Sequence, residues 1–192
     1  MNFSAVILAG GKSSRMGCDK AFLEVAGETL LARQIRLAQT AGATEVFISG
    51  RAEADYSAFA GRVLLDELSE VGPLAGIERA LDAMTTPLLL VLAVDLPDMS
   101  AEFLLALATH CLDKRGAISR VAGLVEPLVA FYPKAAHALA ASRLDQKIFT
   151  AKSFAAACVQ AGHARFIDLP ASDVRHFVNW NSPSDYVLPC TT

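Results

Sequence analysis

The first apolar run of the chain, AVILA at 5–9, leads into a segment rich in glycines and cations, namely Gly10, Gly11, Lys12, Arg15, Gly17 and Lys20. Glycines let a backbone approach a phosphate closely and turn its N–H groups toward it, while lysine and arginine add charge-assisted hydrogen bonds. A glycine pair after a strand is by itself more often a plain turn, and Lys12 fits a solvated loop cation. The combined spacing predicts an anion-binding loop.

Asp95 is a second candidate, because it follows the most apolar run of the chain, PLLLVLAV at 87–94. A carboxylate at the carboxyl end of a parallel strand faces the crevice where ligands bind. Burying it unpaired is costly, so we expect a cation beside it. The alternative is a turn or cap residue, but Ser100 is better placed to cap the next helix.

Asp66, Asn179 and Asn181 are further polar candidates, and each has an equally good structural explanation. Asp66 ends an expected strand and can stabilise its turn. The two asparagines can form an Asx turn before the last helix.

The elements that position these residues alternate through the first 112 residues. Strands are expected at 4–9, 45–49, 62–66 and 88–94, and helices at 29–41, 72–84 and 100–112. This alternation is typical of right-handed βαβ crossovers, so the fold class is α/β with a mostly parallel sheet. The second, third and fourth strands are apolar nearly throughout, as expected when helices cover both faces.

The second half of the chain is less regular. We expect a strand followed by a helix within 123–142, a helix at 149–162 and a strand at 164–169. Ser182 and Pro183 fit the cap and first position of a last helix. There is no repeat, low-complexity segment or linker, so residues 1–192 are predicted to form a single domain.

Composition excludes several classes of protein. A net charge of −3 gives no indication of nucleic acid or membrane as a partner. No secretory signal is visible, and no apolar run is long enough to span a bilayer. The cysteines and histidines lack metal-ligand spacing, and His176 is expected to precede a strand. The protein is therefore predicted to be cytoplasmic, with reduced thiols.

Two common phosphate loops are excluded by their spacing. A Walker A loop needs a glycine five residues before the glycine of GKS, where this chain has Val6. The dinucleotide fingerprint needs G-x-G-x-x-G, and the chain has two adjacent glycines, five residues and then a glycine.

The string L-A-G-G-x-S-x-R-M-G-x-D-K, from Leu8 to Lys20, resembles the N-terminal signature of nucleotidyltransferases that make activated sugars and related conjugates. Within that group it is most similar to the MobA-like molybdenum cofactor guanylyltransferases. The likeness continues at Asp66, GPLAG (72–76), VDLPDMS (94–100) and FVNWNSPSD (177–185). It implies a three-layer α/β/α fold with a mostly parallel, Rossmann-like sheet of the nucleotide-diphospho-sugar transferase type.

The resemblance also implies roles for individual residues. Lys20, Arg15 and Asp95 are expected to be catalytic, with the two cations holding phosphate charge and Asp95 holding Mg²⁺. Asn181, and with less support Asn179, are further expected metal ligands. The implied nucleotide-binding residues are Leu8, Ala9, Gly10, Gly11, Lys20, Ser49, Asp66, Gly76 and Asp95.

The implied reaction is attack by a terminal phosphate of molybdopterin on the α-phosphorus of GTP, with pyrophosphate leaving. Such displacements depend on positioning and charge stabilisation, and Mg²⁺ suits carboxylate and water ligands. The expected partners are GTP and molybdopterin, and a molybdoenzyme or a cofactor-delivery protein is a further candidate. By resemblance Glu126 lies on the pterin side, where its carboxylate can accept hydrogen bonds from the ring.

Two alternatives stay open. Relatives that transfer cytidylyl groups tend to have L-A-A-G where this chain has L-A-G-G, which favours guanine. However, the family often has asparagine where this chain has Ser49, and a serine hydroxyl cannot reproduce the two hydrogen bonds of an amide. A related enzyme that uses CTP or a sugar phosphate is therefore the first alternative. A non-catalytic nucleotide-binding partner in molybdoenzyme maturation is the second, and the presence of Lys20 and Asp95 argues against it.

Overall fold

The computed structural model describes residues 1–10, 19–65, 72–112 and 115–180. Seven strands in this part of the chain form one sheet, in the order β5-β4-β1-β6-β8-β7-β9. They are β1 (Phe3–Leu8), β4 (Glu45–Gly50), β5 (Arg62–Leu65), β6 (Leu88–Ala93), β7 (Gly116–Val121), β8 (Leu124–Pro133) and β9 (Ala164–Leu169). The pairs β1–β4, β1–β6, β4–β5 and β7–β9 are parallel, and β8 is antiparallel to both of its neighbours. The mostly parallel sheet is confirmed.

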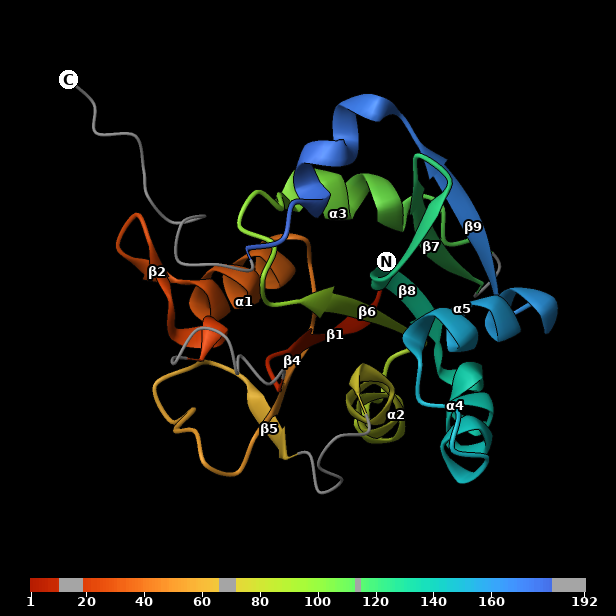
Figure 1. Cartoon of the computed structure of the whole chain (residues 1–192), viewed down its shortest axis with the longest axis horizontal. Helices are drawn as coiled ribbons and strands as arrows, with labels where there is room; N and C mark the ends of the chain where they lie inside the picture. Colours follow the sequence, from red (N-terminus) through yellow and green to blue (C-terminus); the bar gives the residue numbers. More distant parts are fainter. Residues whose placement is uncertain (11–18, 66–71, 113–114, 181–192) are drawn as a thin grey trace.

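Helices cover both faces of this sheet, as Figure 1 shows. On one face lie α1 (Leu30–Thr40) and α3 (Ala101–Ala108). On the other lie α2 (Pro73–Ala83), α4 (His137–Asp145) and α5 (Ala151–Gln160). The expected three-layer α/β/α fold is confirmed. The shorter elements are η1 (Lys20–Phe22), β2 (Glu24–Val25), β3 (Glu28–Thr29), η2 (Lys134–Ala136) and η3 (Ala171–Phe177).

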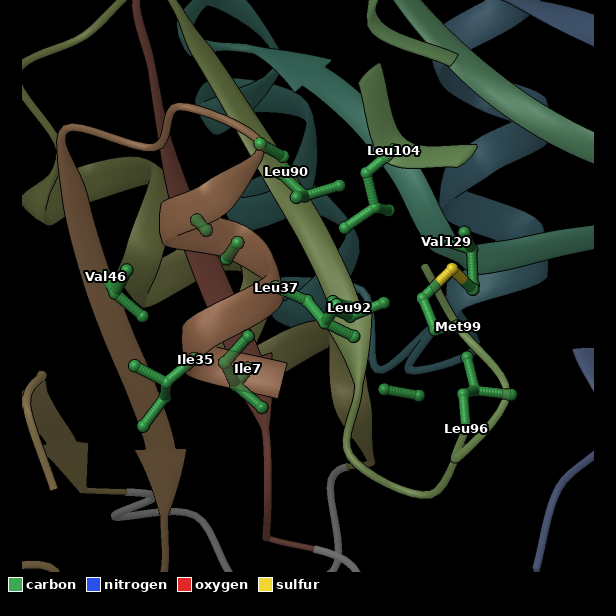
Figure 2. Packing of buried hydrophobic residues seen from close by; sticks show 14 of the residues in the cluster. Ile7, Ile35, Leu37, Val46, Leu90, Leu92, Leu96, Met99, Leu104 and Val129 are labelled. Carbon is green, nitrogen blue, oxygen red and sulfur yellow. The ribbon is translucent and has the colours of Figure 1, made fainter. Parts of the chain in front are cut away.

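Successive residues of the central strands enter two separate cores. Ile7 of β1 packs in the core with α1 and α3, whereas its neighbour Val6 packs in the core with α2 and α5. Figure 2 shows the first core, in which Leu92 of β6 lies near Leu37 of α1, and Ile7 of β1 lies near Ile35 of α1. All of β6 is buried, as expected for a strand covered on both faces. Each fully buried aliphatic side chain contributes about 1.5–3 kcal/mol to stability, so the two cores hold the central strands between the helices.

Capping residues set the helix boundaries. Thr29 accepts a hydrogen bond at Oγ1 from the Ala32 N–H at 3.2 Å and starts α1. Gly42 follows the end of α1 with a φ of +95°, a conformation that favours glycine. Ser100 accepts at Oγ from the Phe103 N–H at 3.2 Å, which confirms it as the cap of α3.

Three expectations differ from the structure. The sequence does not predict β7, because Ser119 and Arg120 interrupt its apolar run, and pairing with β8 and β9 is what makes it a strand. β5 is an edge strand with Arg62 and Leu65 exposed, so the expectation that helices cover both of its faces is wrong. His176 lies in η3, and no strand follows it in the described chain. Ser182 and Pro183 lie outside the described residues.

No helix in the described ranges is both long and apolar enough to cross a membrane.

Gly76 lies inside α2, where a side chain has no room. A Cβ there would lie 2.2 Å from Oγ and 2.9 Å from Cβ of Ser49, and 3.1 Å from Cδ2 of Leu8. The glycine therefore lets α2 pack directly on the ends of β1 and β4. Its expected contact with a nucleotide stays a prediction.

We expect Gly76→Ala to lower the free energy of unfolding by about 1–3 kcal/mol, because the added methyl overpacks this contact. Urea denaturation measures the change. Adding Ser49→Gly removes the two nearest atoms, so a double-mutant cycle is expected to show favourable coupling between the two substitutions. Purely additive effects would contradict a packing role for Gly76.

Candidate active site

The carboxyl ends of β1, β4 and β6 bring the candidate residues to one edge of the sheet. Leu8, the last residue of β1, is level with Ser49 in β4 and Ala93 in β6. The Ala9 N–H donates to the Ser49 carbonyl at 2.8 Å, and the Val94 N–H donates to the Leu8 carbonyl at 3.3 Å. The chain at Ala9 and Gly10 and the segment carrying Asp95 therefore leave the sheet side by side.

Lys20 and Asp95 form an ion pair at this edge. The Nζ atom of Lys20 lies 3.1 Å from Oδ2 of Asp95, and each side chain is about a fifth exposed, at 19% and 21%. The expected cation beside Asp95 is thus Lys20, the last residue of the glycine-rich loop signature. Because both groups are shielded from water, the pair is stronger than an exposed one and costly to break from one side.

A second ion pair fixes the start of η1. Asp19 is the N-cap of η1, and its Oδ1 accepts from the Ala21 N–H at 3.1 Å. Its Oδ2 accepts from Nη2 of Arg51, which directly follows β4. The hydrogen bond to Asp19 raises the pKa of Arg51. This contact ties the residue before Lys20 to the end of β4, and so limits where the Lys20 side chain can start.

A cavity of about 690 Å³ opens beside Asp95. Its walls come from the start of α2, the end of β6, the first half of β8, the segment before α5 with the first turn of α5, and the chain around η3. They are mostly apolar, with a few polar side chains. The lining residues are Gly72, Pro73, Ala93, Asp95, Leu96, Glu126, Pro127, Leu128, Val129, Phe149, Thr150, Ala151, Lys152, Phe177 and Asn179. Such a cavity is large enough for a small organic ligand.

Charge inside this cavity is mixed. Glu126 of β8 is half-buried, and burial raises the pKa of its carboxyl, while the nearby Lys152 partly offsets that effect. Lys152 stands in the first turn of α5, where the helix dipole adds to its positive charge. One wall thus presents an acceptor of hydrogen bonds and another presents a cation.

The other expected site residues are placed as follows. Gly10 follows Ala9 at the end of β1, and Asn179 lines the cavity with Asp95. Ser49 is 2% exposed, with its hydroxyl against α2. Gly11, Arg15, Asp66 and Asn181 lie outside the described residues.

A Mg²⁺ ion fits this site in one mode only. The described ranges contain no group of three or more histidine, cysteine, aspartate or glutamate side chains able to hold a metal ion. Mg²⁺, however, usually keeps several waters and binds one or two carboxylates together with substrate phosphates. Asp95, with Asn179 in the same cavity lining, fits that mode.

None of the described histidines and cysteines lines the cavity. His137 pairs with Glu78 of α2 at 2.8 Å, and neither residue lines the cavity. Cys111 and Cys158 are free thiols, and burial raises their pKa values to about 11 and about 12. Neither thiol is therefore an activated nucleophile.

Comparison with known proteins now identifies the family. The model of the MobA-like NTP transferase domain matches residues 5–161. The chain belongs to this family. It is an enzyme of the nucleotidyltransferase type.

Relatives and solved structures agree with this result. A probable molybdenum cofactor guanylyltransferase of Opitutus terrae is 40% identical over 185 residues, which cover 95% of this chain and 92% of that protein. The molybdopterin-guanine dinucleotide biosynthesis protein A of Archaeoglobus fulgidus has a TM-score of 0.70 and 22% identity, covering 97% and 95% of the two chains. The 2-C-methyl-D-erythritol 4-phosphate cytidylyltransferase of Thermus thermophilus has a TM-score of 0.72 and 21% identity, covering 97% and 96%. At these identities the two structures show the fold alone.

Sequence reasoning missed Arg51 and the cavity residues Phe149 and Lys152. Arg51 has a usable signal, since it follows an expected strand at the same edge as the glycine-rich loop. Phe149 and Lys152 have none, because only the folding of α5 against the sheet brings them near Asp95.

We expect Asp19→Asn to lower the free energy of unfolding by about 1.5–3 kcal/mol, the range for a hydrogen bond to a charged group. The side-chain oxygen of asparagine can still accept the hydrogen bond from the Ala21 N–H, but the neutral amide no longer offers a negative charge to Arg51. Asp168→Asn is the matched control, because Asp168 pairs with Arg120 in an equivalent contact that is far more exposed. Exposed ion pairs contribute little to stability, so Asp168→Asn is expected to leave the denaturation midpoint nearly unchanged. Equal losses of stability in the two variants would contradict the role given to Asp19.

Glu126→Gln is expected to stabilise the protein at neutral pH. Because burial raises the folded-state pKa of Glu126, the folded protein keeps a proton that the unfolded chain has already released above the ordinary pKa of 4.5. The stability of the protein therefore falls as pH rises from 4.5 through the raised pKa of Glu126. Glutamine has no proton to release, so the variant does not lose this stability. Melting temperatures from pH 4 to pH 8 test this.

Glu102→Gln is the control of opposite sign. Hydrogen bonds from its own N–H and from Ser100 lower the pKa of Glu102, so its contribution exists above pH 4.5 and is lost as pH falls. Glutamine there is expected to destabilise the protein at neutral pH. Curves for Glu126→Gln that stay parallel to wild type at every pH would contradict the assignment.

Proposed function

We propose that this enzyme transfers GMP from GTP to molybdopterin, releasing pyrophosphate and forming molybdopterin guanine dinucleotide in a Mg²⁺-dependent reaction. The observation that carries the proposal is the Lys20–Asp95 pair. It joins the glycine-rich loop signature to the wall of the cavity, so a cation suited to phosphate and a carboxylate suited to a metal stand side by side. Relatives named as molybdenum cofactor guanylyltransferases support the choice of substrates.

On the donor side, the backbone from Leu8 to Gly10 contacts the guanine base. Gly11, Ser49, Asp66 and Gly76 complete the proposed nucleotide site. Arg15 and Lys20 hold the phosphates by charge-assisted hydrogen bonds. The hydrogen bond between Ala9 and Ser49 supports this arrangement, because it holds the base-contacting backbone against the end of β4.

Asp95 holds the Mg²⁺ ion, with Asn181 and Asn179 as further oxygen ligands. When bound, Mg²⁺ neutralises charge on the phosphate oxygens. A terminal phosphate oxygen of molybdopterin attacks the α-phosphorus, and the bond from that phosphorus to its bridging oxygen breaks. Pyrophosphate leaves with the electron pair, and Lys20 and Arg15 stabilise the charge that develops on it.

On the acceptor side, molybdopterin occupies the cavity beside Asp95. Glu126 accepts hydrogen bonds from the N–H groups of the pterin ring, and the aromatic rings of Phe149 and Phe177 provide apolar surface for it. Lys152 balances the negative charge of the acceptor. The mixed charge of the cavity supports this choice, because the acceptor carries both ring donors and an anionic phosphate.

A related enzyme that uses CTP, or a sugar phosphate as acceptor, is the alternative, because the same fold also carries cytidylyl transfer in the Thermus thermophilus protein. Membership of a nucleotidyltransferase family argues against the non-catalytic alternative. Association with a molybdoenzyme or a cofactor-delivery protein, cytoplasmic location and a single domain stay predictions from the sequence.

We expect MgGTP to raise the melting temperature more than MgATP, MgCTP or MgUTP, because ligands that bind only the native state stabilise it by about 2.7 kcal/mol at 100 times Kd. With molybdopterin present, wild-type protein is expected to release pyrophosphate from GTP. Lys20→Ala and Asp95→Ala are expected to lower that release by about 100-fold or more. Mass analysis of the dinucleotide product identifies the transferred base.

Asp145→Ala, an exposed substitution at the end of α4, is the matched control and is expected to keep full turnover. A larger shift with MgCTP would replace the guanylyl assignment with the cytidylyl one. Full turnover in Lys20→Ala or in Asp95→Ala would remove that residue from the mechanism.

A further inference from the structure

Four successive backbone carbonyls, from Asp95 to Asp98, each accept a hydrogen bond from a different remote residue. The Trp180 N–H donates to Asp95 O at 3.1 Å, and Gln34 Nε2 donates to Leu96 O at 2.7 Å. Arg33 Nε donates to Pro97 O at 2.8 Å, and His176 Nδ1 contacts Asp98 O at 2.7 Å. Four donors from outside the turn therefore hold four consecutive backbone carbonyls in place.

We infer that Arg33, Gln34 and His176 are positioning residues for Asp95: they hold the turn 95–99 so that the Asp95 carboxylate faces Lys20 and the cavity. The inference rests on the proposed function for the role of Asp95. None of the three side chains lines the cavity, so each acts through the backbone of the turn.

Most donors to these carbonyls come from outside the turn. Leu96 and Pro97 are buried, so carbonyls there that found no partner would be costly. Pro97 has no N–H, and within the turn the Met99 N–H donates to Leu96 O at 3.2 Å. The other donors come from α1, from η3 and from Trp180, which follows η3.

The buried position of Gln34 supports the inference, because stability alone would favour an apolar side chain there. It lies on the buried stripe of α1, four residues after Leu30 and three after Leu31, and is 0% exposed. Its Oε1 atom is buried and has no hydrogen-bond partner among the described residues. An apolar side chain would avoid that unsatisfied acceptor, so the benefit of glutamine lies in its bond to the turn.

His176 holds the last carbonyl from the opposite side. A carbonyl oxygen can only accept, so Nδ1 of His176 carries the hydrogen. The ring is 5% exposed and packs on Phe103 of α3, with ring centroids 4.9 Å apart. The tautomer and the ring orientation are therefore both fixed, and η3 is tied to the turn that begins at Asp95.

The test compares Gln34→Met with Gln39→Met, the same chemical change on the exposed side of α1. In Gln34→Met we expect amide exchange of Leu96, Asp98 and Met99 in the metal-free protein to speed up at least tenfold. We also expect the Mg²⁺ concentration needed for half-maximal thermal stabilisation by GTP to rise about tenfold. A misplacement of a functional group by about 1 Å commonly costs this much or more.

If Gln34 and His176 only stabilised the fold, replacing them would lower the melting temperature without changing the Mg²⁺ requirement. The variant His176→Asn keeps a donor near the place of Nδ1 and is expected to recover most of the wild-type Mg²⁺ requirement, whereas His176→Phe is not. In turnover, Gln34→Met is expected to lower kcat with little change in the KM for MgGTP. Gln39→Met is expected to match wild type throughout.

An unchanged Mg²⁺ requirement in both Gln34→Met and His176→Phe would overturn the inference. Running the same titrations with CTP, ATP and UTP separates it from the proposed function. If another nucleotide gives the largest stabilisation, the guanylyl assignment fails, while the effect of Gln34→Met on the Mg²⁺ requirement of that nucleotide still decides the inference.

Discussion

The contact on which the site depends is the ion pair between Lys20 and Asp95. Each side chain is only about a fifth exposed, so the ion pair offsets part of the desolvation cost of both charges. Their separation of 75 residues along the chain means that the pair exists only because β1 and β6 are adjacent and parallel. In the proposed function, a bound triphosphate with its metal would give each of these two charges a new partner of opposite charge.

Each member of the pair is held by polar contacts from outside the cavity. Asp19 and Arg51 tie the start of η1 to the end of β4, while Arg33, Gln34 and His176 hold the turn after β6. Polar side chains this buried are usually tolerated only with their hydrogen bonds made. The unsatisfied Oε1 atom of Gln34 shows that this protein accepts some loss of stability here. The surrounding apolar cores supply the rigid strands on which both sets of contacts rest.

The site has two chemically different sides, the glycine-rich segment and the cavity. The glycine-rich loop side follows from local sequence, because its glycines and cations are close together in the chain. The cavity side combines residues from β6, β8, the segment before α5 and η3, whose sequence separations are large. If the proposed function is correct, the residues that recognise the second substrate come from distant parts of the chain. The pattern of residues in the sequence therefore indicates the phosphate chemistry more clearly than the acceptor.

The sequence by itself determined the α/β class, the cap at Ser100 and the first parallel strands, because local periodicity and short-range hydrogen bonds decide these features. It also indicated Lys20 and Asp95 and the need for a cation beside Asp95. Only the tertiary structure decided that Lys20 is that cation, that Gly76 is needed for helix packing, and that Arg51 and Gln34 support the pair. The sequence also did not predict β7, because its pairing with β8 and β9, and not its own composition, makes it a strand. These features depend on which elements become neighbours, and chain-local patterns carry no information about neighbours that fold in from a distance.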